Sequence, residues 1–339
     1  MDVYEELCQL VGAEFPPVSG ADAVCPQMIR HWCEAMQEDN PLYLDEEHGR
    51  RTRHGSILAP PAMTPAWVMP PLWPPSGMAP IYERLFGICG QGGYDQVIDS
   101  ESQMEFLRPL LPGDRVHSSP RIASVSGLKR TALGEGFFVS QESVFANQRR
   151  ETVCRQLMTM YLYRGQGARA FDGPPPAPEG AVTPWQSAGV SRSPWNIGAA
   201  AADVPPRRDL AWGGVTTGDR LPSYSRLMTT TAVIAAAVAS RDFAPMHHDF
   251  RAARGAGVRD IFVNYLTTGG IAAKWLTDWS RPGGELRRLK LKLMTPCCAG
   301  DTLALTGTVQ EKLVAAGEAF EEVAFTKAVA EGTHCRGEA

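Results

Sequence analysis

The stretch DFAPMHHD, residues 242–249, has an earlier counterpart in EDNPLYLD, residues 38–45. Each stretch follows a segment of helical character, CPQMIRHWCEAMQ in the first half of the chain and TTTAVIAAAVASR in the second. Further along each half, a short turn with the letters PGD or AGD leads into a strand, in PLLPGDRV at 109–116 and PCCAGDTL at 296–303. Two separate motifs that recur in the same order indicate an internal duplication.

Hydrophobic periodicity predicts the same kinds of elements in both halves. The threonines at 229–231 can cap a helix that continues through alanines. Residues 263–279 carry one apolar helical face, made of Ala272, Trp275, Leu276 and Trp279. RRLKLKLM alternates leucine with lysine as a half-buried strand does, and FFVSQESVFAN and TVCRQLMTMYLY are typical of long antiparallel strands. Helices followed by such strands predict an α+β fold, with an antiparallel sheet wrapped around a long buried helix in each half.

A change of composition separates the two halves. Residues 166–206 are rich in proline, glycine and alanine, and prolines at that density interrupt both helices and strands. We therefore expect an N-terminal domain at 1–165, a linker at 166–206 and a C-terminal domain at 207–339.

The bulk composition excludes several classes of function. The chain has 339 residues, of which 44% are hydrophobic, and a net charge of −4 without a basic block, which argues against a nucleic acid or a membrane surface as partner. No apolar run reaches the ~18 residues of a membrane span, and the start, MDVYEELCQL, lacks the pattern of a signal peptide, so we expect a cytoplasmic protein. None of the eight cysteines forms a CxxC pair, and no metal site is predicted.

Asp242 and His247 are the residues of the repeated turn that could carry chemistry. They lie five positions apart across a proline, which favours a turn that brings carboxylate and imidazole together. From the spacing alone, the favoured interpretation is structural: Asp242 caps a helix and His247 packs in the interior. The alternative is an acid–base pair that holds one water and moves a proton to or from carbon. A metal site is disfavoured, because the adjacent His247 and His248 diverge on any regular element.

The segment from Asp242 to His247 resembles the D-x-N-P-x-H signature of MaoC-like (R)-specific enoyl-CoA hydratases and dehydratases. The resemblance extends to both halves, through MIRHWCEAMQEDNPLY and APPAM in the first and DIFVNYLTTGGIAAKWLTDW and PCCAGDTL in the second. It implies two tandem hot-dog domains, the second of them catalytic. One position departs from the signature: its asparagine is Ala244 here.

The resemblance assigns roles to five residues of the second half. Asp242 and His247 would hold the water that adds to a 2-enoyl thioester. Backbone N–H groups of Tyr265 and Leu266, at the start of the long helix, would stabilise the enolate-like oxygen. Asn264, directly before that helix, would contact the substrate.

The first half carries a degenerate version of this constellation. Glu38 takes the place of the aspartate and Tyr43 that of the histidine, and tyrosine, with a pKa near ~10, is a poor base at neutral pH. The corresponding helix start is APPAM, whose Pro60 and Pro61 have no N–H to donate. This half is therefore expected to be non-catalytic and to accommodate the acyl tail, with the region of Trp67, Leu72 and Trp73 as either a tunnel wall or ordinary core.

The sequence thus predicts a hydratase or dehydratase that interconverts 2-enoyl and 3-hydroxyacyl thioesters of coenzyme A or acyl carrier protein, with a bulky acyl group. No cofactor is expected, and a homodimer is the expected assembly. The alternatives are a thioesterase or biosynthetic cyclase on the same fold, and a non-catalytic subunit that binds acyl thioesters.

Overall fold

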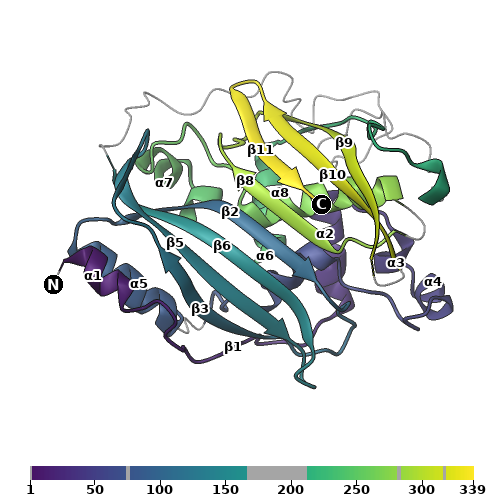
Figure 1. Cartoon of the computed structure of the whole chain (residues 1–339), viewed down its shortest axis with the longest axis horizontal. Helices are drawn as coiled ribbons and strands as arrows, with labels where there is room; N and C mark the ends of the chain where they lie inside the picture. The colour runs from purple at the N-terminus through teal and green to yellow at the C-terminus, as the bar shows by residue number, and fades with distance from the viewer. Residues whose placement is uncertain (1, 74–76, 166–211, 281–283, 316–317) are drawn as a thin grey trace.

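The computed structural model describes residues 2–73, 77–165, 212–280, 284–315 and 318–339. The expected linker at 166–206 therefore lies outside the described residues, and the domain boundaries stay a prediction. Figure 1 shows a curved antiparallel sheet on one side of the protein, with helices packed behind it. In the described part of the chain, no helix combines the length and the apolar character that crossing a bilayer requires.

The helices come in two similar sets. The first half contains α1 (Val3–Cys8), α2 (Pro26–Met36), α3 (Pro41–Leu44), α4 (Glu46–Arg51), the 3-10 helix η1 (Pro61–Val68) and α5 (Pro80–Gln91). The second half contains η2 (Trp212–Gly214), α6 (Thr230–Ser240), η3 (Pro245–His247), α7 (Phe250–Gly255) and the long α8 (Tyr265–Ser280). The predicted cap of α6 is present, since the side chain of Thr229 accepts a hydrogen bond from the N–H of Ala232.

The strands form one antiparallel sheet that runs through both halves. In the first half they are β1 (Val18–Ser19), β2 (Gln96–Phe106), β3 (His117–Val125), β4 (Lys129–Thr131), β5 (Gly134–Ala146) and β6 (Thr152–Gly165). In the second half they are β7 (Tyr224–Leu227), β8 (Arg288–Leu293), β9 (Thr302–Ala315), β10 (Glu318–Val329) and β11 (Gly332–Glu338). The order across the sheet is β1-β3-β5-β6-β2-β8-β11-β10-β9-β7, with β4 paired to β5 at the side.

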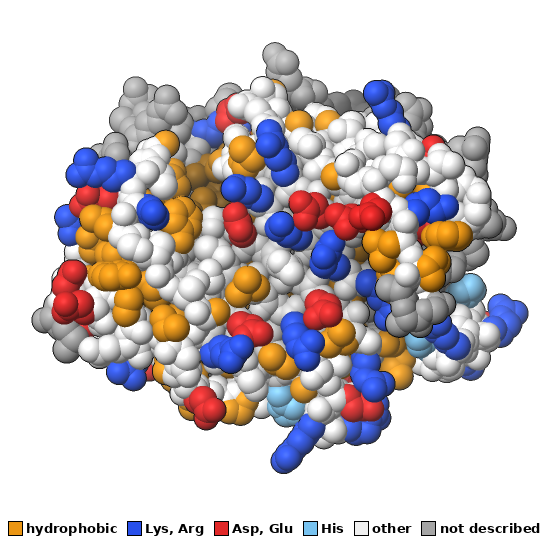
Figure 2. Space-filling view, in the orientation of Figure 1, with side chains coloured by type: hydrophobic (Ala, Val, Ile, Leu, Met, Phe, Trp, Pro, Cys, Tyr) orange, Lys and Arg blue, Asp and Glu red, His pale blue; other side chains and the backbone are white. Residues whose placement is uncertain are grey.

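The two halves meet where β2 pairs with β8. On the inner face of this strand pair, Ser102 lies opposite Leu291 and Met104 opposite Leu289. Gln103 and Lys290, between them, point outward. On the outer face, Glu101 forms an ion pair with Lys292, which lies directly opposite it on β8. Figure 2 shows this outer face, where lysine and arginine alternate with aspartate and glutamate. In a sheet with one solvent-exposed face, this alternation of apolar and charged residues fixes the register of the strands.

The duplicated motifs adopt matching backbone conformations. Gln37 is the C-terminal cap of helix α2, and Arg241 is that of α6. Both cap residues have a left-handed backbone conformation, with φ of 58° and 57°. An acidic residue follows each cap, and its side chain accepts a hydrogen bond from the backbone N–H of the residue two positions after it. Asn40 donates to Glu38 at 2.8 Å, and Ala244 donates to Asp242 at 3.3 Å. The two copies of the turn therefore share one geometry, as the duplication predicts.

The PGD and AGD turns also match in detail. Gly113 and Gly300 have φ of 96° and 92°, a conformation that glycine adopts without steric cost. The aspartate after each glycine accepts a backbone N–H from three residues earlier: Leu111 donates to Asp114 at 2.9 Å, and Cys298 to Asp301 at 2.7 Å. The predicted α+β fold of two tandem hot-dog units is confirmed in this arrangement.

The two halves differ in their central helices. In the second half, α8 is continuous over 16 residues, and all residues from Leu266 to Thr277 are buried. In the first half, the segment that begins at APPAM forms only the 3-10 helix η1, and the longer α5 starts at Pro80. Prolines at 60, 61, 65, 70 and 71 explain the break, because a proline inside an α-helix removes a hydrogen bond and clashes with the preceding turn.

The close approach of α8 to α2 provides a test of this packing. A Cβ atom at Gly270 would lie 2.8 Å from both Met36 Sδ and Trp32 Cζ2, whereas at Gly269 the nearest atom, on Leu291, would be 3.6 Å away. We expect Gly270→Ala to lower the free energy of unfolding by about 1–3 kcal/mol relative to Gly269→Ala, because only the former overpacks the contact. Chemical denaturation of the two variants measures the difference. Equal stability would contradict this contact between the halves.

Candidate active site

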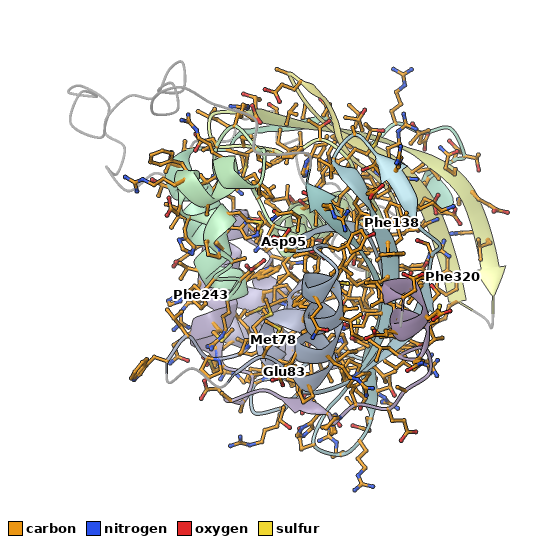
Figure 3. The ribbon with its side chains drawn as sticks, turned by 90° about the vertical axis from the view of Figure 1, so that its left-hand side faces the viewer. Met78, Glu83, Asp95, Phe138, Phe243 and Phe320 are labelled. Atoms are coloured by element: carbon orange, nitrogen blue, oxygen red, sulfur yellow. The ribbon has the colours of Figure 1, made fainter. Side chains whose placement is uncertain are left out.

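A cavity of about 900 Å³ lies between the two halves and is lined by both. From the second half come the turn after α6, the start of α8 and the segment at His334, and from the first half come β2, β5, β6 and α5. Met78 and Leu133 line it and are themselves exposed, so they mark its open end. Figure 3 labels Met78 and Phe138, two residues of the first half that line this cavity.

Asp242 and His247 stand side by side in this cavity. Asp242 Oδ2 and His247 Nε2 are 3.5 Å apart, and their side chains are 15% and 8% exposed. The 3-10 helix η3, which starts at Pro245, turns the chain sharply enough to bring the two together across five positions. The pair that the sequence suggested is thus brought together by the fold.

The hydrogen bonds of His247 define its tautomer. Its Nδ1 lies 2.8 Å from the backbone oxygen of Phe262, and because a carbonyl can only accept, Nδ1 carries the proton. In the neutral ring, Nε2 is then a lone-pair acceptor that faces Asp242. Two acceptors cannot bond to each other, so both are available to a donor placed between them.

The start of α8 supplies free backbone donors. Asn264 caps the helix: its Oδ1 accepts the N–H of Thr267 at 2.7 Å, and its Nδ2 donates to Ser240 Oγ at 2.8 Å. In the described part of the chain, the N–H groups of Tyr265 and Leu266 have no acceptor. Tyr265 lines the cavity, while the Leu266 side chain belongs to the core. Asn264 also lines the cavity, but both ends of its side chain bond to protein groups.

Polar residues behind α8 hold its first turn in place. His334 donates from Nδ1 to the backbone oxygen of Thr295 at 2.7 Å, and its Nε2 lies 3.0 Å from the Thr268 hydroxyl. Burial lowers the pKa of His334 to about 4, so the ring is neutral and Nε2 accepts from the hydroxyl. Lys327, completely buried, donates to the backbone oxygen of Thr268. Thr268 and His334 both line the cavity and were not recognised in the sequence.

The two tryptophans expected near the acyl tail lie elsewhere. Trp67 is 3% exposed and packs in the main core, and Trp73 is 83% exposed on the surface. Neither is among the described residues that line the cavity; the adjacent Val68, Met69 and Pro70 are. The tryptophan-rich region therefore reaches the cavity through neighbours of the residues that the sequence singled out, and a role for it at the acyl tail stays a prediction.

Asp99, on β2 of the first half, is a further polar residue of the cavity that the sequence did not single out. It lies close enough to Asp242 for the two carboxyl groups to interact. Burial raises the pKa of Asp99 to about 7, and the neighbouring Asp242 adds to the rise. Asp99 is thus a second carboxyl group near Asp242 in the cavity, and it comes from the first half of the chain.

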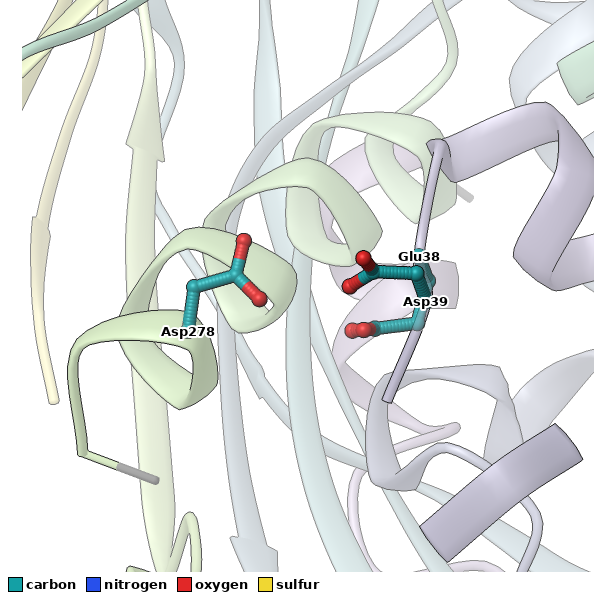
Figure 4. Close-up of side chains that lie close together, drawn as sticks. All are labelled: Glu38, Asp39 and Asp278. Carbon is teal, nitrogen blue, oxygen red and sulfur yellow. The ribbon is translucent and has the colours of Figure 1, made fainter. Parts of the chain in front are cut away.

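The copy of the turn in the first half has the same backbone geometry but different side chains around it (Figure 4). Glu38 is buried and lies beside Asp39 and Asp278, with carboxylate oxygens within 4.8 Å of one another. Lys274 forms an ion pair with Asp278 at this place. Tyr43 occupies the position that corresponds to His247 and is 5% exposed. This copy has neither an imidazole nor a place in the wall of the 900 Å³ cavity.

The comparisons with known proteins agree with the fold. Residues 9–156 match the family model of the FAS1-like dehydratase domain region. A probable enoyl-CoA hydratase alpha subunit from Thermomonospora curvata is 37% identical over 164 residues, which cover 48% of this chain and 51% of that protein. The beta subunit of a 3-oxo-4,17-pregnadiene-20-carboxyl-CoA hydratase from Mycobacterium tuberculosis is 37% identical over 92 residues, 27% of this chain and 71% of that protein.

Among solved structures, a MaoC-like dehydratase superposes with a TM-score of 0.70 at 18% identity and covers 98% of both chains. The fold is that of a double hot-dog protein, and its second half brings Asp242 and His247 together at one turn. The chain belongs to the MaoC-like family of hydratases and dehydratases. It spans about half the length of the alpha-subunit relative that it matches.

The two copies of the turn predict the effect of restoring the missing asparagine. In the first half, Asn40 Oδ1 accepts the N–H of Leu42 at 3.1 Å. Ala244 has nearly the same backbone angles, but its methyl group cannot accept such a hydrogen bond. We expect Ala244→Asn to raise the free energy of unfolding by about 1 kcal/mol and Asn40→Ala to lower it by a similar amount. Denaturant titration measures both. If Ala244→Asn is neutral while Asn40→Ala destabilises, the two turns are not equivalent.

The raised pKa of Asp99 predicts a pH dependence of stability. The unfolded chain releases this proton near the ordinary pKa of 3.8, but the folded protein keeps it up to about pH 7. The folded state therefore loses stability relative to the unfolded state as pH rises from about 4 to 7. Asp99→Asn cannot ionise and should lose less stability over this interval. Thermal unfolding across the interval tests this, and parallel curves for the two proteins would contradict it.

Proposed function

We propose that the protein is a hydratase or dehydratase that interconverts 2-enoyl and 3-hydroxyacyl thioesters of coenzyme A. The observation that carries the proposal is the pair of acceptors, Asp242 Oδ2 and His247 Nε2, 3.5 Å apart in a cavity wall. A single water can donate one hydrogen bond to each of them. Its oxygen lone pair is then directed away from both, towards a carbon placed in the cavity.

In hydration, the water oxygen bonds to the β-carbon while one of its protons passes to the Asp242–His247 pair. The π electrons of the double bond move towards the thioester carbonyl, which becomes enolate-like. The proton is then delivered to the α-carbon, so no net charge remains. In dehydration the same bonds form and break in reverse order. Acid–base assistance by a positioned pair of this kind contributes about 10²–10⁴-fold to the rate.

The developing oxyanion requires donors, and the start of α8 is suited to supply them. The free N–H of Tyr265 lies at the N-terminus of a 16-residue helix, whose dipole favours negative charge there. The N–H of Leu266 is the second candidate. Because Asn264 caps the helix and bonds to Ser240, we assign it a role in holding these donors in position.

The size and lining of the cavity favour a bulky acyl group. Its volume of about 900 Å³ is near the upper end of the range for small-molecule sites, and aromatic and methionine side chains of the first half form much of its wall. The first half thus contributes binding surface, and the second half contributes the reacting groups. The beta-subunit relative is named for a steroid-derived thioester. That name supports an acyl group of similar bulk for this chain.

The similarity to relatives named alpha and beta subunits supports a related proposal. We infer that this chain combines in one polypeptide the two kinds of hot-dog unit that those relatives carry as separate subunits. Acyl carrier protein as an alternative carrier, and a homodimer as the assembly, remain proposals.

Turnover of a panel of 2-enoyl-CoA thioesters tests the function. We expect hydration by the wild type and a loss of about 10²–10⁴-fold in kcat/KM for Asp242→Asn and for His247→Gln, since an amide side chain can accept a hydrogen bond but cannot take up the proton of the water. His248→Gln is the matched control, because His248 is exposed, is not among the described residues that line the cavity, and bonds through Nε2 to the backbone oxygen of Phe243. The absence of hydration by the wild type, or full activity in either site variant, would refute the assignment. Release of free thiol without a hydrated product would point to a thioesterase.

A further inference from the structure

Asp99 faces the cavity because the strand that carries it is irregular. Along β2, Ser102, Met104 and Phe106 are buried and face the core, so regular alternation would turn Asp99 outward. The pairing of β2 with β6 shifts at this point, however: Asp99 lies opposite Met160, and Glu101 opposite Thr159.

Ser100 is therefore an extra residue, a β-bulge, and its hydroxyl donates to the backbone oxygen of Thr159 at 2.9 Å. The bulge moves the inward positions from the even to the odd residues, so that Val97 packs on the core and Asp99 lines the cavity. Bulges are frequent beside active sites, where they redirect a side chain.

The carboxyl group of Asp99 is unpaired as far as the described residues go. Within the part of the chain that the structure describes, no hydrogen bond or ion pair involves its side chain. The titratable groups around it are Asp242 from the turn after α6, Tyr82 from α5 and Tyr265 from α8. None of these is a cation. Both tyrosines have raised pKa values through burial and stay neutral.

The surroundings of Asp99 are otherwise largely apolar. Val97, Met158 and Met160 line the same wall and belong to, or pack on, the core of the first half. A hydrocarbon chain that fills this wall would displace solvent from the carboxyl group and give it no hydrogen bond in return. A polar group without a partner in such a place is costly, whereas an oxygen of the ligand would satisfy it.

We propose that Asp99 is a specificity-determining residue, which donates a hydrogen bond to a keto or hydroxyl oxygen on the acyl chain. The cavity would then select oxygen-bearing acyl thioesters over plain hydrocarbon ones. Since Asp99 lies near Asp242, the oxygen would be within a few carbons of the reacting β-carbon. This inference rests on the proposed thioester function, and it names the substrate class of that same site.

The protonation of Asp99 gives the proposal a pH signature. With a pKa of about 7, the group is a neutral acid below that pH and can donate to a ketone. Above it, the carboxylate can no longer donate. The preference for a keto-substituted chain should therefore weaken as pH rises through about 7. In Asp99→Asn the amide donates at every pH, so its preference should be independent of pH.

Binding of saturated thioesters separates this inference from catalysis. Isothermal titration calorimetry would compare decanoyl-CoA with its δ-keto and ε-keto derivatives, which have no double bond to hydrate. At pH 6 we expect the wild type to bind at least one keto ligand about tenfold more tightly than decanoyl-CoA. Asp99→Leu should lose this preference, chiefly by binding decanoyl-CoA better. Asp99→Asn should keep it at both pH 6 and pH 8.

Gln103→Leu is the control variant, since Gln103 is an exposed residue on the same strand, and its ratio of affinities should match that of the wild type. Equal affinities for all ligands in the wild type, or an unchanged ratio in Asp99→Leu, would overturn the inference. Selective binding without hydration of any 2-enoyl thioester would instead overturn the proposed function and leave the role of Asp99 intact. Asp99→Asn, which is close to isosteric, covers the case in which Asp99→Leu does not fold.

Discussion

The hydrogen bond from His247 Nδ1 to the backbone oxygen of Phe262, 2.8 Å long, is the interaction on which the site depends. It fixes the ring, leaves Nε2 as an acceptor beside Asp242, and ties the repeated turn to the chain that leads into α8. Val263, the next residue, donates to the backbone oxygen of Cys297, and Cys298 donates to Asp301. The two motifs that recur in the sequence thus meet at one short segment. A rotation of the AGD turn would displace both the imidazole and the start of α8.

The duplication explains the division of labour between the halves. Both copies retain the left-handed helix end, the turn and the glycine–aspartate corner, because these are needed to build a hot-dog unit. The first copy has lost the imidazole, and its prolines have broken the central helix into η1 and α5. The first half contributes a large part of the cavity wall. Under the proposed function, the second half would supply the reacting groups and the first half the surface that matches the acyl group.

The sequence predicted the elements that depend on local pattern. The helix at TTTAVIAAAVASR, the apolar face of α8 and the alternating strand at RRLKLKLM follow from spacing and periodicity. For Asp242 and His247 the spacing alone favoured a structural role, and the resemblance assigned them as the pair that the fold brings within 3.5 Å. It could not predict Asp99, because strict alternation turns that residue outward and only the pairing with β6 reveals the bulge. Thr268 and His334 were missed since they lie 66 residues apart and meet only in the folded chain. The signature's asparagine is retained in the first copy as Asn40, whose side chain caps the turn, a contact that becomes visible only in the structure.

The central claim is that His247 presents an unprotonated Nε2 to the cavity. Nitrogen-15 NMR of histidine-labelled protein at neutral pH tests it directly, with the His247 signals assigned by comparison with His247→Gln. The proposed mechanism requires the proton on Nδ1 and a free Nε2, visible as a protonated Nδ1 and an unprotonated Nε2 shift. A ring protonated on Nε2 would direct a hydrogen at Asp242 and leave no second acceptor for water, and this result would contradict the mechanism.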